Sequence, residues 1–213
     1  MNDWVERVAE VAGRGSDCVL VTVADVRGSA PREPGARMIV THAAASDTIG
    51  GGNLEAACVE RARALLATGG EPTAQLVRYP LGPGSGQCCG GVATILFERV
   101  EWNRAGWLPA VQAHVCAADP GVVVTVAEGR CSGAKLIAGR HAHSGTLGDA
   151  SLDAMALVRA RALLAGAEGE WTPRLHALHA ATASTVAFFE PLRPSSLEIV
   201  LFGAGHVGRA LVD

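Results

Sequence analysis

The sequence predicts a mixed α/β fold with an internally duplicated unit, and two observations lead to this prediction. Short β-branched runs such as 19–23 and 122–126 alternate with stretches whose apolar residues recur at helical spacing. The heptapeptide RARALLA occurs twice, beginning at Arg61 and at Arg159, an offset of 98 residues. Similar strands and glycine turns flank both heptapeptides, so we predict a repeated strand–loop–strand–helix unit.

Each element follows from local pattern. Apolar residues at helical spacing and β-branched runs predict helices at 4–12, 53–67 and 108–117, and strands at 18–23, 38–41, 74–79, 92–97, 122–126 and 185–190. Glycine and proline predict loops at 26–37 and 80–91. On the 53–67 helix, Leu54, Cys58 and Ala62 mark one apolar face.

The repeat also divides the chain into expected domains. Residues 1–194 are expected to form an N-terminal domain of two similar units, at about 17–100 and 120–190. The segment PLRPSS at 191–196 has the composition of a linker. Residues 197–213 pass from an apolar strand into a glycine turn, which predicts the truncated start of a Rossmann-like domain.

Composition limits the classes of function. Hydrophobic residues make up 49% of the 213 residues and charged residues 18%, which favours a folded chain with a sizeable core. The net charge of −3 provides no basic field for nucleic acid or an anionic membrane. The sequence shows neither a signal peptide nor an apolar run of about 18 residues, so we expect a soluble cytoplasmic protein.

The turn at 48–55, TIGGGNLE, is the first candidate site. Gly50, Gly51 and Gly52 precede a helix, where unpaired backbone N–H groups can cradle a phosphate. The second copy has Asp149 in the matching turn, and its carboxylate would repel an anion. An ordinary strand-to-helix turn remains the alternative, although such a turn needs only one glycine.

The loop at 27–38, RGSAPREPGARM, is the second candidate. Arg32 and Arg37 offer guanidinium groups suited to a phosphate or a polar heterocycle. The second copy is shorter at this point and lacks the Pro-Arg pair. The alternative is a surface loop whose arginines are solvated.

The pair Cys88–Cys89 is the most specific chemical signal. It lies in a glycine-rich loop that is expected to keep both thiols accessible, and thiolates bind soft metals or carry a persulfide. Two inert thiols or a vicinal disulfide remain alternatives. The other cysteines are expected to have no chemical role, and the first three of them to be small buried hydrophobes: Cys18, Cys58, Cys116 and Cys131.

A third glycine motif lies near the end of the sequence. Gly203, Gly205 and Gly208 follow an apolar strand and open a helix, which is the setting of a dinucleotide-binding turn. We expect a Rossmann start here, with a nucleotide as a candidate ligand.

Taken together, these motifs resemble the XdhC/CoxI family of xanthine dehydrogenase accessory proteins. The resemblance is carried, in order, by GSAPREPGARM at 28–38, IGGGNLE at 49–55, GQCCGG at 86–91 and LFGAGHVGRAL at 201–211. It extends from about residue 5 to the end. It implies an N-terminal domain followed by a Rossmann-like domain.

The resemblance also implies a function. The protein would be a chaperone, rather than a metabolic enzyme, that binds the molybdenum cofactor (molybdopterin) transiently and assists its sulfuration and insertion into a xanthine dehydrogenase-type apoenzyme. A cysteine desulfurase would be a second partner, and a homo-oligomer is expected. The implied cofactor-binding residues, of which the two cysteines are also metal ligands, are Arg32, Arg37, Gly50, Gly51, Gly52, Asn53, Glu55, Gln87, Cys88, Cys89, Gly203, Gly205 and Gly208.

Two other functions remain open at this point. An NAD(P)-dependent oxidoreductase would use the turn at Gly203, but no catalytic acid–base set is visible beside it. A pure scaffold would bind only the client hydroxylase and a desulfurase, and it would need no cysteine pair.

Overall fold

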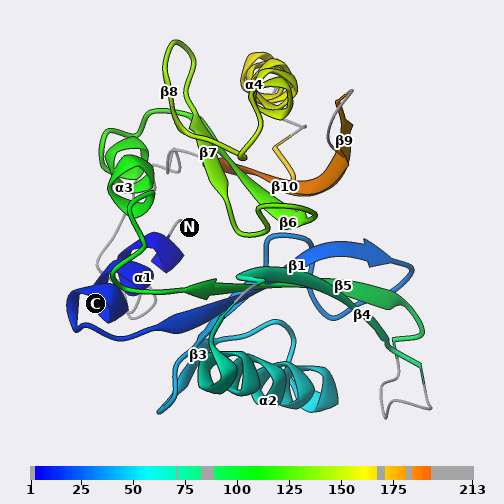
Figure 1. Cartoon of the computed structure of the whole chain (residues 1–213). Helices are drawn as coiled ribbons and strands as arrows, with labels where there is room; N and C mark the ends of the chain where they lie inside the picture. Colours follow the sequence, from blue (N-terminus) through cyan, green and yellow to red (C-terminus); the bar gives the residue numbers. More distant parts are fainter. Residues whose placement is uncertain (1–2, 71, 83–88, 167–170, 181–183, 193–213) are drawn as a thin grey trace, which may run out of the picture.

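A computed structural model describes residues 3–70, 72–82, 89–166, 171–180 and 184–192. Within these residues the chain forms four helices and two five-stranded antiparallel sheets. The layers follow the order helix, sheet, sheet, helix, with two further helices side by side at one end (Figure 1). The predicted mixed α/β class is confirmed, whereas the expected Rossmann start at 197–213 lies outside the described residues.

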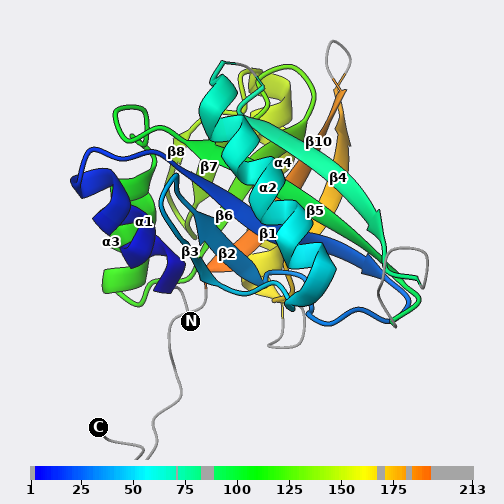
Figure 2. The same cartoon turned by 90° about the horizontal axis from the view of Figure 1, so that it is seen from below.

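The first copy is one sheet crossed by one helix. Its elements are α1 (Asp3–Gly13), β1 (Cys18–Arg27), β2 (Arg37–Val40), β3 (Ala45–Asp47), α2 (Gly52–Thr68), β4 (Ala74–Pro80) and β5 (Val92–Val100). The strand order is β3-β2-β1-β5-β4. The helix α2 lies along the outer face of the sheet (Figure 2), and there it buries Leu54, Cys58 and Ala62 as the helical spacing predicts.

The second copy repeats this arrangement. Its elements are α3 (Leu108–Cys116), β6 (Gly121–Glu128), β7 (Lys135–Ala138), β8 (His143–Gly145), α4 (Ala150–Ala165), β9 (Arg174–His179) and β10 (Ser184–Leu192). The strand order, β8-β7-β6-β10-β9, is that of the first copy. The repeat is therefore longer than predicted, because it includes the preceding helix and two short strands.

The differences from the sequence prediction have local causes. The strands β3 and β8 have three residues each, which is too short to show an alternating pattern. Half of the residues of β9 are polar, and the strand lies at a sheet edge. The predicted linker begins too early, because Pro191 and Leu192 belong to β10. Pro191 lies beyond the part of β10 that pairs with β9, where a missing N–H is tolerated.

The two sheets face each other across a shared buried layer. Leu20 and Ile39 of the first sheet lie in one cluster with Val123 and Ile137 of the second. Strands expose alternate residues to opposite faces, so each central strand contributes one row to its own helix and one row to this layer. The outer helices and the opposite copy thus bury the central strands of each sheet on both faces.

A buried ion pair crosses this layer from β2 to β10. Arg37 Nη2 donates to Glu190 Oε2 at 2.8 Å, and Arg37 Nε donates to Thr22 Oγ1 at 3.0 Å. The guanidinium carbon lies 4.2 Å from the centre of the Trp4 ring, within the range of a cation–π contact. Strands of both copies and α1 therefore surround this cation.

The second copy forms an equivalent ion pair with the first. Lys135, which follows Arg37 by the repeat offset, forms a buried ion pair with Glu98 on β5. Its Nζ also donates to Thr125 Oγ1 at 2.7 Å and lies 4.9 Å from the centre of the Trp107 ring. Because β7 and β5 correspond to β2 and β10, the two ion pairs are reciprocal, as in a two-fold interface.

We expect Lys135→Met to lower the free energy of unfolding by about 3–5 kcal/mol, because it leaves the Glu98 carboxylate buried without its cation. The double variant Lys135→Met/Glu98→Leu should recover much of that loss, because it removes both charges together. Denaturant unfolding of the parent, both single variants and the double variant measures this coupling. Additive losses would contradict a buried, coupled pair.

Candidate functional site

Three of the predicted motif segments meet at one end of the first sheet. A Cβ on Gly50 would lie 2.6 Å from the Pro31 side chain, and a Cβ on Gly91 would lie 2.2 Å from the Ser29 carbonyl oxygen. The loop between β1 and β2 is therefore in direct contact with the glycine turn and with the end of the cysteine loop. Arg32 is brought close to Gly50 by this packing, with its Cγ 3.5 Å from the same Cβ position.

Only part of the cysteine loop is described. Leu81 N donates to Gly91 O and Gly90 N donates to Leu81 O, both at 2.8 Å, so the two ends of the loop are held together. Cys89 is half-buried and packs against the core beneath α2. Gln87 and Cys88 lie outside the described residues.

The glycine turn has a conformation that ordinary side chains rarely adopt. Gly50, Gly51 and Gly52 have φ values of 126°, 74° and 65° in succession. As the N-cap of α2, Gly51 provides no side-chain hydrogen bond to the first turn, in which Asn53 is exposed. Three glycines in succession thus permit three successive positive φ values, whereas the matching turn of the second copy has one glycine, Gly148, with a positive φ.

The matching turn of the second copy is capped instead. Asp149 has an extended backbone, with φ of −148°, and its carboxylate accepts from Ser151 N at 2.9 Å and Leu152 N at 3.1 Å. The cap residue of α4 therefore places a carboxylate at the helix N-terminus of the second copy. The cap residue of α2 is Gly51, which has no side chain to do so. This difference separates two otherwise equivalent turns.

Glu55 holds the turn together from within. Its Oε2 accepts from Thr48 Oγ1 at 2.5 Å, and from Ile49 N and Gly51 N at 3.1 Å each. The hydrogen bond from Thr48 and those from the two N–H groups hold the pKa of Glu55 below its ordinary value, although burial acts in the opposite direction. Asp153 makes the corresponding bonds in the second copy. This shared role shows that Glu55 stabilises the shape of the loop, and its place among the predicted cofactor-binding residues stays a prediction.

The sequence suggested that Arg37 lies in an exposed loop, but it does not. It is the first residue of β2, its side chain is 6% exposed, and its guanidinium pairs with Glu190. Its Nη1 is buried and has no hydrogen-bond partner among the described residues. The signal for a structural role was available in the sequence, because Lys135 is also basic at the same position of the repeat.

A hollow of about 670 Å³ lies beside this arginine. Its lining includes Trp4, Arg32, Arg37 and Thr48, so it joins the arginine loop to the start of the glycine turn. Asp47 at its edge is neutralised by Arg7 at 3.2 Å. Within the described part of the chain, the guanidinium of Arg32 makes no ion pair, although Asp3 and Glu33 also line the hollow, so the opening has no excess of positive charge.

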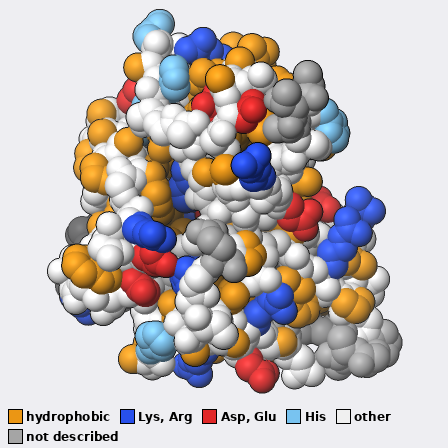
Figure 3. All heavy atoms as spheres, in the orientation of Figure 1, with side chains coloured by type: hydrophobic (Ala, Val, Ile, Leu, Met, Phe, Trp, Pro, Cys, Tyr) orange, Lys and Arg blue, Asp and Glu red, His pale blue; other side chains and the backbone are white. Residues whose placement is uncertain are grey.

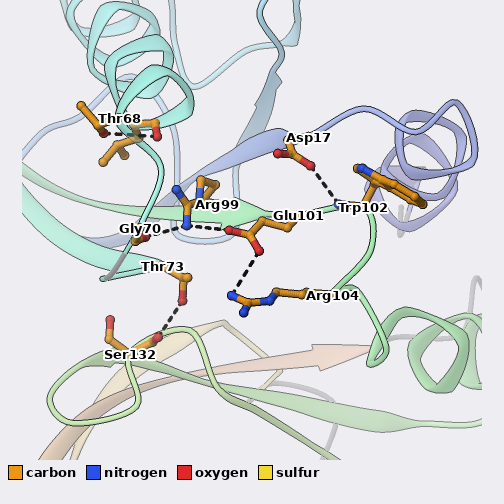
Figure 4. Close-up of polar contacts among 10 residues, drawn as sticks. Asp17, Thr68, Gly70, Thr73, Arg99, Glu101, Trp102, Arg104 and Ser132 are labelled. Carbon is orange, nitrogen blue, oxygen red and sulfur yellow. Dashed lines mark hydrogen bonds and ion pairs between the residues drawn. The ribbon is translucent and has the colours of Figure 1, made fainter.

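The corresponding hollow, which β5 of the first copy and the 129–134 loop of the second copy both line, has its cations paired. It measures about 690 Å³, and Arg99 and Arg104 line it (Figure 4). Glu101 accepts from Arg99 at 2.7 Å and pairs with Arg104 at 3.3 Å. Thr73 donates to Ser132 O at 2.7 Å across the two copies. The two hollows therefore differ in the pairing of their arginines, because Arg32 makes no ion pair among the described residues, whereas Arg99 and Arg104 both pair with Glu101.

The remaining cysteines divide by burial. Burial raises the pKa of Cys18 and of Cys58 to about 12, so both are unreactive thiols near neutral pH, as expected. Cys116 was expected to be buried, but it is exposed at the end of α3. Cys131 is also exposed. The described residues contain no cluster of three or more His, Cys, Asp or Glu side chains that would hold a metal ion.

Two further observations concern the surface charge and the length of the apolar helices. On the face shown in Figure 3, basic, acidic and apolar side chains are mixed, and neither sign of charge forms one large field. In the part of the chain that is described, no helix is long and apolar enough to cross a membrane.

Comparison with known proteins identifies a related family. The sequence profile of the XdhC and CoxI family matches residues 11–80, which include the arginine loop and the glycine turn. A crystal structure described as a xanthine dehydrogenase from Bacillus halodurans is similar in fold, with a TM-score of 0.55 and 23% sequence identity. The similarity covers 66% of this chain and 44% of that chain, so the chain spans less than half the length of that protein. No curated protein matches the chain.

We expect Glu55 to stabilise the fold in a pH-dependent way. Since its folded pKa is lowered, its contribution is fully present above the unfolded value of about 4.3 and is lost as the pH falls through the folded pKa. Unfolding of the parent and of Glu55→Gln should differ most near neutral pH and converge at acidic pH. Glu60→Gln, at an exposed position of the same helix, is the control and should not show this convergence.

We also expect the described cysteines to differ in alkylation. Iodoacetamide at pH 7.5 should modify Cys116 and Cys131 in the folded protein, because both are exposed. Cys18 and Cys58 should react only after unfolding, because they are buried thiols with raised pKa values. Peptide mass spectrometry of folded and denatured samples measures this pattern. Rapid labelling of Cys58 in the folded protein would contradict the packing of α2.

Proposed function

We propose, on the premise that residues 11–80 form an XdhC/CoxI-type segment, that this protein is an accessory protein for a xanthine dehydrogenase-type molybdenum hydroxylase. It would bind the molybdenum cofactor as cargo at the loops of the first copy, and it would assist the sulfuration and insertion of that cofactor into the apoenzyme. The observation that carries the proposal is the direct contact among the arginine loop, the glycine turn and the end of the cysteine loop.

The residues at these loops suit the chemistry of such a cargo. Molybdopterin has a phosphate, a polar pterin and a dithiolene-bound molybdenum. Arg32 provides a guanidinium without an ion pair among the described residues, whereas the Nη1 of Arg37 is buried and would reach the cargo only if its surroundings moved. The cap residue of α2, Gly51, makes no side-chain hydrogen bond to the first turn, which suits an anion there, while the Glu55 carboxylate binds the preceding N–H groups of Ile49 and Gly51. The thiols of Cys88 and Cys89 are soft ligands for the metal.

The second copy supports this proposal as an internal comparison. It folds into the same sheet and helix without the Pro-Arg pair, the triple glycine or the cysteine pair. Its helix start is occupied by the Asp149 carboxylate. Because the fold does not require these features, their presence in the first copy calls for another explanation, and ligand binding is the one we propose.

The partners follow from the same proposal. The apoenzyme would receive the cofactor, a cysteine desulfurase would supply sulfur, and the accessory protein would act in the cytoplasm as a homo-oligomeric chaperone rather than as a metabolic enzyme. The turn at Gly203, Gly205 and Gly208 remains a predicted nucleotide site outside the described residues. No described residue favours the alternative NAD(P)-dependent oxidoreductase.

We expect Arg32→Ala and Cys88→Ser/Cys89→Ser each to reduce bound cofactor at least tenfold, because each removes a charge or a thiol pair from the proposed site. The protein would be purified from cells supplied with molybdate, and bound molybdenum and the fluorescence of oxidised pterin would be measured per folded molecule.

Arg130→Ala is the control, since Arg130 lies in the corresponding, shorter loop of the second copy. It should retain the cofactor. Equal retention by all variants would reject the proposed site, and bound nicotinamide in place of pterin would favour the oxidoreductase.

A further inference from the structure

The outer face of the second copy has an apolar groove between α4 and β9. The groove measures about 750 Å³, and Met155, Val158 and Ala162 of α4 line it together with Arg159, Arg174 and His176. We refer to these six residues as the α4–β9 strip. Val158 is 73% exposed and Met155 is 38% exposed, and both are among the few exposed large hydrophobic side chains of the described residues.

The first copy shows that the fold does not require this apolar surface. At the repeat offset, Ala57 takes the place of Met155, and Glu60 takes the place of Val158. Both residues of α2 are exposed, as are their counterparts on α4. The same helix with the same RARALLA segment is therefore stable with a small residue and a carboxylate at these positions. Burying Met155 and Val158 against another molecule would remove apolar surface from water, which would stabilise the complex.

The two copies also differ in how they use the arginine beside the groove. In the first copy, Arg61 Nη2 donates to Gln75 Oε1 at 2.7 Å, and its guanidinium carbon lies 5.6 Å from the Phe97 ring centre. Gln75 pairs with Phe97, as Arg174 pairs with Phe189 in the second copy. The second copy therefore replaces a hydrogen-bonded Arg–Gln pair by two arginines, which repel each other.

The charge of the strip is unbalanced. Arg159 and Arg174 form no ion pair among the described residues, and the described lining of the groove contains no carboxylate. Both arginines act on His176, and together with burial, the larger cause, they lower its pKa. A ligand with carboxylates beside an apolar face would match both features of the strip.

The width of the sheet leaves room for such a ligand in helical form. Five strands span roughly 20 Å at about 4.8 Å each, whereas one helix covers about 10 Å. The single helix α4 therefore leaves space along the β9 edge for a second helix beside it. A symmetric contact between the strips of two copies of this chain would bring arginines together, which disfavours that occupant.

We propose that the α4–β9 strip is a docking surface for an amphipathic helix of a partner protein, with an apolar face bordered by Asp or Glu side chains. Met155 and Val158 would contact the apolar face, and Arg159 and Arg174 would bind the carboxylates. This inference is independent of the proposed cofactor site, because all of its residues belong to the second copy.

The test uses a phage-displayed library of random 16-residue peptides, selected against the whole protein and depleted on Met155→Ala/Val158→Glu. This variant carries the residue types of the first copy, so it is expected to fold, and circular dichroism would verify this. Selected peptides should have apolar residues at helical spacing with flanking Asp or Glu. Fluorescence anisotropy should show at least tenfold weaker binding to this variant and to Arg159→Gln/Arg174→Gln.

The matched control is Ala57→Met/Glu60→Val in the first copy. It should bind the selected peptides as the parent does, because Arg61 remains bonded to Gln75 and offers no free guanidinium. Selection of no acidic amphipathic sequence, or undiminished binding by either strip variant, would overturn the proposal.

Discussion

Two buried cations, Arg37 and Lys135, reach from one sheet to a carboxylate on the other, and this reciprocal crossing fixes how the two copies fit together. The layer between the sheets is otherwise mostly apolar. A slide of one sheet past the other would leave buried ions without partners, at a cost of several kcal/mol per ion. The ion pairs therefore restrict the register of the interface, whereas apolar contacts alone would tolerate small shifts.

The same constraint positions the candidate cofactor site. Arg37 begins β2, so its anchorage in the interface fixes the end of the loop that carries Arg32. The other side of that loop rests on the turn at Gly50 and on Gly91. Glu55 then secures the turn by accepting three hydrogen bonds. The proposed ligand contacts thus lie on loops whose shape is fixed by the sheet interface and by one carboxylate.

Duplication allows the two copies to differ where the fold does not constrain them. The first copy combines the arginine loop, the triple glycine and the cysteine loop, whereas the second has a capped helix start at Asp149. The second copy instead exposes Val158 where the first has Glu60. Under the two proposals, one copy would bind the cargo and the other would bind a partner helix, while both contribute equally to the shared interface.

Periodicity in the sequence was sufficient for the fold class, the repeat and most helices and strands, because these depend on neighbouring residues. The buried positions of Cys18 and Cys58 also followed from local pattern. The exposure of Cys116, the burial of Arg37 and the place of Pro191 in β10 did not. Each depends on contacts with distant segments: Arg37, for example, is buried against Glu190, far along the chain, and against the Trp4 ring. Residue types and spacing therefore indicate which groups are available for chemistry, and packing between the copies selects those that remain free to perform it.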